Sequence, residues 1–135
     1  MLDKENGVPA VSGPVCLCVL DDQSDTWGHG YDSLGPTVGR LEGAEVSVEE
    51  RGPVRACLRV ESAFGRSSAV QRWYAYADLS LLECRLTVDW REPRKALKLV
   101  LPLALSQAVA TYEVPYGYAS RPCDGTEQPG GQWSD

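Results

Sequence analysis

The chain has 135 residues, of which 43% are hydrophobic and 24% are charged. These values are ordinary for a globular protein, so they exclude the disordered and fibrous classes and predict one soluble domain over residues 1–135. The formal net charge of -6 argues against a nucleic-acid partner, which needs clustered Lys and Arg side chains. The longest apolar run, Leu97 to Leu105, is too short and too interrupted to span a bilayer, so no membrane association is expected.

The cysteines favour a reducing compartment. The 5 cysteines cannot all pair within one chain, and four of them lie in strand-like patterns among apolar neighbours. Residues 1–7 contain neither the basic nor the apolar part of a secretion signal, so we expect a cytoplasmic protein. A metal site in this chain is not expected, because there is no C-x-x-C pattern and His29 is the single histidine.

A period of two dominates the hydrophobic pattern, and no stretch keeps helical spacing for three turns. We expect strands at Pro14 to Leu20, Ala44 to Glu50, Pro53 to Ser62, Val70 to Asp78, Leu82 to Trp90, Ala96 to Leu103 and Ala108 to Tyr118. About seven strands are enough to pack two sheets against each other. The predicted fold is therefore an all-β antiparallel sandwich.

Turn residues separate these segments. Gly28 to Gly39 is rich in Gly, Pro and Ser, Arg51 to Pro53 is a tight break, and Arg91 to Arg94 is a charged corner. Pro115 predicts a sheet edge or a bulge near the end of the last strand. Residues 119–135 are expected to be loop-like, although Trp133 so close to the end suggests a docked side chain or a chain meant to continue.

The most unusual segment is Leu20 to Asp32. It gathers carboxylates, aromatic rings and the histidine: Asp21, Asp22, Asp25, Asp32, Trp27, Tyr31 and His29. Carboxylates that accept hydroxyl hydrogen bonds, together with an indole that packs on a sugar ring, are typical of carbohydrate sites on loops. An Asp- and Gly-rich turn anchored by Trp27 is the alternative. The pattern leaves both interpretations open.

No complete catalytic site is predicted. A glycosidase needs two carboxyl groups about 5 to 10 Å apart, and no such pair is identified, since Asp21 and Asp22 would diverge on a strand. A triad of Ser24, His29 and Asp32 is disfavoured, because the sequence has no G-x-S-x-G elbow. Calcium at Asp21, Asp22 and Asp25 is a further hypothesis, although the EF-hand pattern is absent.

Four stretches together resemble one known family. They are Ser24 to Gly30, Gly52 to Ala56, Leu86 to Trp90, and Thr111 to Gly117 followed by Arg121-Pro122 and Gln132-Trp133. Their order and spacing resemble the C-terminal β region of glycoside hydrolase family 38, the retaining α-mannosidases. The resemblance runs from about residue 10 to the end of the chain. It implies a supersandwich-like, galactose-mutarotase-like fold that is incomplete in this chain.

The resemblance also implies how catalysis is divided in the parent enzyme. The family's zinc ligands and aspartate nucleophile belong to an N-terminal domain, and no position here matches them. Zinc is therefore expected in that domain and no cofactor in this chain. The parent is expected to hydrolyse α-mannosides, whereas this chain alone is not expected to be an enzyme. Its expected partners are its own catalytic domain and the mannoside substrate.

The candidate substrate-rim residues are Asp25, Trp27, His29 and Tyr31, because the β region of the family lends a few residues to the substrate pocket. The alternatives are an independent carbohydrate-binding module that uses Trp27 and Tyr31, and a protein-interaction domain. In the family the sequence continues past Gln132-Trp133 into further strands. Sheet edges or apolar faces should therefore lack partners here, which predicts self-association.

Overall fold

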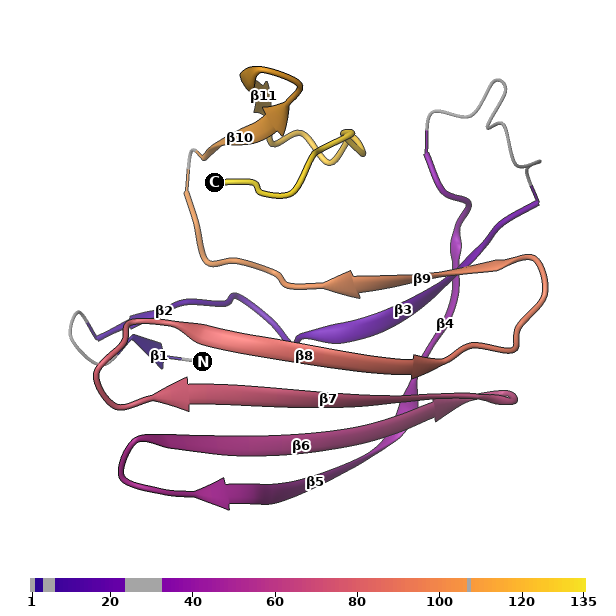
Figure 1. Ribbon diagram of the computed structural model, residues 1–135. Helices are drawn as coiled ribbons and strands as arrows, with labels where there is room; N and C mark the ends of the chain where they lie inside the picture. Colours follow the sequence, from indigo (N-terminus) through magenta and orange to yellow (C-terminus); the bar gives the residue numbers. More distant parts are fainter. Residues whose placement is uncertain (1, 4–6, 24–32, 107) are drawn as a thin grey trace. The chain divides into compact units, whose positions relative to one another are not determined.

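The computed structural model describes residues 2–3, 7–23, 33–106 and 108–135 (Figure 1). In this part of the chain all regular structure is β, which confirms the predicted class. The strands are β1 (Leu2–Asp3), β2 (Val8–Pro9), β3 (Cys16–Asp21), β4 (Thr37–Arg40), β5 (Glu42–Arg51), β6 (Arg55–Phe64), β7 (Ser67–Tyr76), β8 (Leu82–Asp89), β9 (Lys95–Val100), β10 (Val109–Val114) and β11 (Gly117–Pro122). No described segment forms a helix long and apolar enough to cross a membrane.

The chain divides into two compact units. One contains Met1–Val15, Ser24–Leu34 and Leu101–Asp135, and the other contains Cys16–Gln23 and Gly35–Val100. The larger unit holds a four-stranded antiparallel sheet in the order β5-β6-β7-β8 and a three-stranded antiparallel sheet in the order β4-β3-β9. The smaller unit holds the pairs β1-β2 and β10-β11. Several antiparallel sheets, none of them closed, agree with an incomplete β-sandwich.

The four-stranded sheet has one polar and one apolar face. The register sets Arg59 opposite Arg72, and Arg72 opposite Arg85, so that charged side chains of three strands share one face. The other face carries the apolar side chains of the alternation. Several of these are exposed to solvent: Val46, Val48, Leu58, Leu82, Leu86 and Val88. The predicted alternation is therefore confirmed, although much of the apolar face lacks a cover in the described residues.

The best buried part of the core lies along β3. Leu17 and Val19 are 1% and 0% exposed, and their neighbours Cys18 and Leu20 are also buried. Strand β3 lies between β4 and β9, and consecutive side chains of a strand point to opposite faces. Both faces of β3 are therefore covered, which explains why this short run is continuously apolar rather than alternating.

Two boundary predictions need correction. The single strand expected over Ala108 to Tyr118 is a hairpin, because β10 ends at Val114 and β11 begins at Gly117. Pro115 has no backbone N–H, and Tyr116 has a φ of 67°, so the chain reverses there instead of continuing. Strand β4 lies partly inside the expected turn region Gly28 to Gly39, because register with β3 can organise a short segment of weak propensity.

Candidate functional site

The C-terminal residues of the smaller unit form an extended segment that pairs with β10 of the β10-β11 hairpin. The N–H of Glu113 donates to the carbonyl of Trp133 at 3.1 Å, and the N–H of Gly131 donates to the carbonyl of Glu113 at 3.0 Å. Thr111 and Asp135 exchange two backbone hydrogen bonds of 2.6 and 2.8 Å. Residues 131–135 therefore run antiparallel to β10. This pairing explains how the backbone of Trp133 is held in place near the end of the chain.

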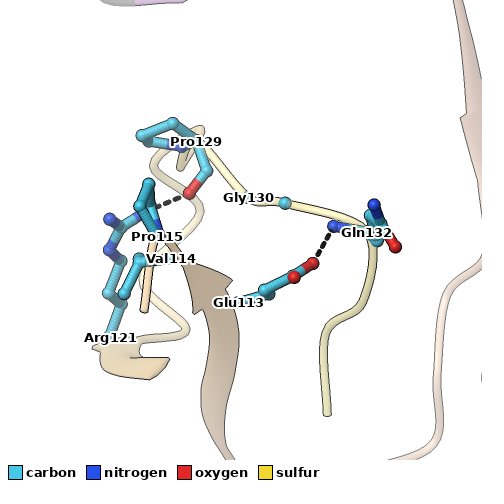
Figure 2. A pocket seen from close by; sticks show the side chains of 8 residues that line it. Glu113, Val114, Pro115, Arg121, Pro129, Gly130 and Gln132 are labelled. Carbon is cyan, nitrogen blue, oxygen red and sulfur yellow. Dashed lines mark hydrogen bonds between the residues drawn. The ribbon is translucent and has the colours of Figure 1, made fainter. Parts of the chain in front are cut away.

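A hollow of about 520 Å³ lies between this segment and the hairpin (Figure 2). Its described lining is Glu113, Val114, Pro115, Arg121, Pro129, Gly130, Gly131 and Gln132. A second hollow of about 310 Å³ shares Gly130, Gly131 and Gln132 and adds Tyr112 and Trp133. Apolar walls with a few convergent polar groups are the usual composition of a small-molecule site.

The charged groups of the larger hollow hold the tail in place. The Glu113 carboxylate accepts a hydrogen bond from the backbone N–H of Gln132, and Arg121 donates to the carbonyl of Pro129 (Figure 2). The Arg121 guanidinium also lies 5.4 Å from the centroid of the Tyr112 ring, within the range of a cation–π contact. A Cβ at Gly131 would come within 2.6 Å of the Glu113 carboxylate, so any other residue there would require the Glu113 side chain to shift.

This arrangement does not supply glycosidase chemistry. Glu113 is the single carboxylate among the described residues that line the larger hollow, whereas the reaction uses two carboxyl groups flanking the bond. In the described part of the chain, no group of three or more His, Cys, Asp or Glu side chains is placed to hold a metal ion. The hollow can therefore shape a surface or contact a polar ligand, and no catalytic step is assigned to it.

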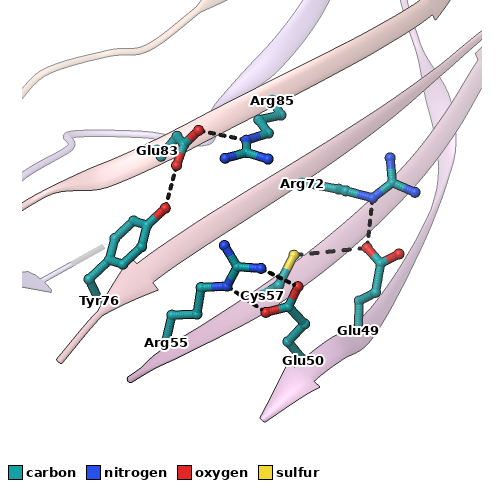
Figure 3. Close-up of polar contacts among 8 residues, drawn as sticks. All are labelled: Glu49, Glu50, Arg55, Cys57, Arg72, Tyr76, Glu83 and Arg85. Carbon is teal, nitrogen blue, oxygen red and sulfur yellow. Dashed lines mark hydrogen bonds and ion pairs between the residues drawn. The ribbon is translucent and has the colours of Figure 1, made fainter. Parts of the chain in front are cut away.

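A second concentration of charge lies on the polar face of the four-stranded sheet (Figure 3). Tyr74 is 6% exposed, and the guanidinium groups of Arg55 and Arg85 lie 4.9 and 4.8 Å from its ring centroid. Arg55 donates two hydrogen bonds to Glu50, of 2.7 and 2.9 Å, which is the bidentate geometry. Arg85 donates to Glu83 at 2.6 Å. The arginines therefore cover a buried tyrosine while their charges are neutralised beside it.

The same network shifts the pKa values of Glu83 and Tyr76. The bond from Arg85, followed by the bond from Tyr76, lowers the pKa of the Glu83 carboxyl below its ordinary value. The bond to Glu83 is also the main cause that raises the pKa of Tyr76. Arg72 similarly donates to Glu49 at 2.7 Å (Figure 3). Because every charge in this set has an opposite charge beside it, the network is better explained as sheet structure than as a binding site.

The predicted rim residues Asp25, Trp27, His29 and Tyr31 lie outside the described residues, as do Ser24 and Asp32 of the disfavoured triad. Their roles remain predictions. Asp21, from the calcium hypothesis, accepts hydrogen bonds from Gln23 at 2.8 Å and Lys95 at 3.3 Å. The bond from Gln23, with a smaller part from Lys95, lowers the pKa of Asp21. The calcium hypothesis itself stays untested, since Asp25 is one of its three residues.

The residues of the C-terminal hollow were not predicted as a site. The sequence did contain a sign of this site, because Glu113, Arg121 and Gln132 all lie in the stretches that carry the family resemblance. What was missing is the antiparallel return of residues 131–135 along β10, which brings Gln132 to the carboxylate of Glu113. Sequence periodicity cannot reveal such a return in a segment rich in Gly and Pro.

The model of the glycosyl hydrolases family 38 C-terminal domain matches residues 1–134. A search of curated proteins finds no match to the chain.

Proposed function

The chain belongs to the family of glycosyl hydrolases family 38 C-terminal domains, and from this premise we propose that it serves as scaffold and substrate-pocket rim in a retaining, zinc-dependent α-mannosidase. Membership makes it a non-catalytic domain of a family 38 enzyme and implies a catalytic partner domain in the parent chain. In the proposal that partner domain holds the zinc and the nucleophile, and the parent cleaves α-mannosides in the cytoplasm.

The scaffold role rests on one observation. The last of the stretches that carry the resemblance lines the C-terminal hollow, where Glu113, Arg121 and Gln132 hold the tail against the hairpin. Hydrogen bonds to charged groups are stronger than neutral ones, so they give this surface a defined shape. A defined surface is what a domain needs in order to position another domain beside it.

The rim role is assigned to Asp25, Trp27, His29 and Tyr31. In the parent enzyme, a rim residue that binds substrate without touching the reacting bond should change KM more than kcat. We expect Trp27→Ala to raise KM for an α-mannoside about fivefold or more and to leave kcat within about twofold. Tyr116→Ala is the control, since Tyr116 is fully exposed on the β10-β11 turn. An unchanged KM in Trp27→Ala would remove the rim role.

An independent carbohydrate-binding module is the second candidate. It is favoured by exposed aromatic side chains of the smaller unit, Tyr118 and Trp133, of which Trp133 lines the smaller hollow. Titration of the 135-residue chain with methyl α-mannoside, followed by amide NMR shifts, separates the candidates. The scaffold role predicts no binding at millimolar sugar. Saturable shifts that disappear in Trp133→Ala or Trp27→Ala would support the module instead.

A protein-interaction domain, like the scaffold, would show no sugar binding in this titration.

We propose that this chain also associates with itself, because the sheet face carrying Val46, Leu58 and Leu86 is apolar and exposed. Sedimentation over a range of concentrations tests the proposal. A monomer at every concentration would contradict it.

A further inference from the structure

The outer edge of β8 differs from the other sheet edges. Within the described residues β8 pairs with β7 alone, and most of its 8 side chains are exposed. The strand contains no proline, and its pairing with β7 is continuous from Leu82 to Asp89, without a bulge. A long regular strand with an open edge presents backbone donors and acceptors that another strand can pair with.

Three other edges, those of β5, β9 and β11, carry features that discourage pairing. The opposite edge strand, β5, has two register shifts and several glutamates. Strand β9 carries only positive charges, at Lys95 and Lys98, and β11 ends in Pro122. Bulges, charged side chains and proline are the devices that protect sheet edges, and charges of one sign also repel a second copy of the same strand. Strand β8 instead carries both signs, at Glu83, Arg85 and Asp89.

The order of these charges makes β8 complementary to itself. We propose that β8 pairs antiparallel with β8 of a second copy of the chain, about a two-fold axis that passes beside Cys84. This register sets Glu83 of each copy opposite Arg85 of the other, on the polar face of both sheets. It also sets Leu82 opposite Leu86 on the apolar face. In a two-fold contact each pair of residues occurs twice, so the favourable Glu83–Arg85 pair stabilises the contact twice.

The side chains are able to serve both sides of this contact. Glu83 and Arg85 are 32% and 57% exposed while they pair within one chain. A guanidinium has five N–H donors, and a carboxylate can accept several hydrogen bonds. The four charges around the axis would therefore alternate in sign, and the intrachain pair would not have to break. Figure 3 shows Glu83 and Arg85 side by side on β8.

The neighbouring registers of the β8-β8 pair are less favourable than the one centred on Cys84. A register centred on Arg85 sets Arg85 opposite Arg85. A register centred on Leu86 sets Glu83 opposite Asp89. Both registers therefore place like charges opposite each other. A register centred on Thr87 would pair Arg85 with Asp89, but it runs into the residues after β8. There the N–H of Arg91 donates to Ser67 at 2.8 Å and Trp90 donates to the carbonyl of Lys95 at 3.3 Å. Those residues are already tied to their own unit.

This inference deepens the self-association proposed above and does not depend on mannosidase activity. The test uses two variants of the 135-residue chain, Glu83→Arg and Arg85→Glu, studied by sedimentation and native mass spectrometry. Each variant alone opposes like charges across the axis, so its dimer dissociation constant should rise about tenfold or more. An equimolar mixture should form the heterodimer with near wild-type affinity, because both pairs are then opposite in charge. Repair of an intrachain contact cannot produce this rescue.

The cysteine at the axis gives an independent measurement. Residues directly opposite in an antiparallel pair have Cα atoms about 4.5 to 5.5 Å apart, which lies within the disulfide range. In a Cys123→Ser background, oxidation by diamide should link Cys84 to Cys84 of the second copy, and Cys84→Ser should abolish the link. If the single variants dimerise as tightly as the wild type, or the mixture shows no rescue, this register is overturned even where self-association persists. A chain that stays monomeric overturns both proposals.

Discussion

The ring of Phe64 in β6 fills the space that a side chain on Gly39 in β4 would need. A Cβ at position 39 would lie 2.5 Å from Cε2 of Phe64, which is closer than van der Waals contact allows. Because β4 and β6 belong to different sheets, this approach is a packing contact between the two sheets of the larger unit. It requires glycine for its size and not for an unusual backbone conformation.

A side chain at position 39 should disturb this contact. Gly39→Ala should lower the free energy of unfolding by about 1–3 kcal/mol, because one methyl group overpacks the junction. Urea unfolding of the wild type and the variant measures the difference. Gly117→Ala is the matched control, since a Cβ there meets nothing within 4 Å. An equal loss in both variants would show that Phe64 is not the cause.

The β10-β11 turn offers a stabilising change. Tyr116 has a φ of 67° and a side chain exposed to solvent, so it holds a left-handed conformation without a compensating contact. This conformation costs a residue with a Cβ about 1 kcal/mol relative to glycine. Tyr116→Gly should therefore raise the free energy of unfolding by up to about 1 kcal/mol. Thermal unfolding checks this, and Tyr118→Gly in β11 should have the opposite sign.

Glu113 should control the order of the C-terminal tail. Its carboxylate accepts the N–H of Gln132, so Glu113→Ala removes the acceptor. Hydrogen exchange at residues 131–135 should then become faster, by about tenfold for a bond worth roughly 1.5 kcal/mol. Glu113→Gln keeps an amide oxygen and should show a smaller increase. Exchange rates that do not distinguish the three proteins would contradict the role of this bond.

The pH dependence of stability should include a contribution from Glu92. The N–H of Arg66 donates to this carboxylate at 2.7 Å, and this bond, with a smaller part from Ser67, lowers the pKa of Glu92 from its ordinary 4.5. The folded state therefore binds its proton less readily than the unfolded chain does. The resulting stabilisation is fully present above about pH 4.5 and is lost as the pH falls through the lower, folded pKa.

Comparison with Glu92→Gln isolates this effect. The difference in unfolding free energy between the wild type and the variant should be constant from neutral pH down to about pH 5 and should shrink below the ordinary pKa of 4.5. Urea unfolding at a series of pH values measures it. A difference that grows on acidification would mean that Glu92 is protonated more easily in the folded chain.

The alternation of side chains was enough to predict β6 and β8. Arg55, Arg59 and Glu61 alternate with apolar residues, and this period of two puts the polar set on one face whatever the neighbouring strands are. The glycine and proline at Gly52-Pro53 likewise marked the β5-β6 turn, where the N–H of Gly52 donates to the carbonyl of Arg55. These features are local, so the sequence carries them directly.

The partners of each element were decided by the tertiary structure. The sequence by itself determined the all-β class, the polar and apolar faces and the family resemblance, because these depend on local period and short motifs. Only the fold decided that Val46 and Leu58 remain exposed while Leu17 and Cys18 are buried on opposite faces of β3. Only the fold brought Glu113 to Gln132 and, in the part of the chain that the structure describes, gave β8 no partner strand other than β7. Pairing between distant segments depends on three-dimensional register, and no local pattern encodes it.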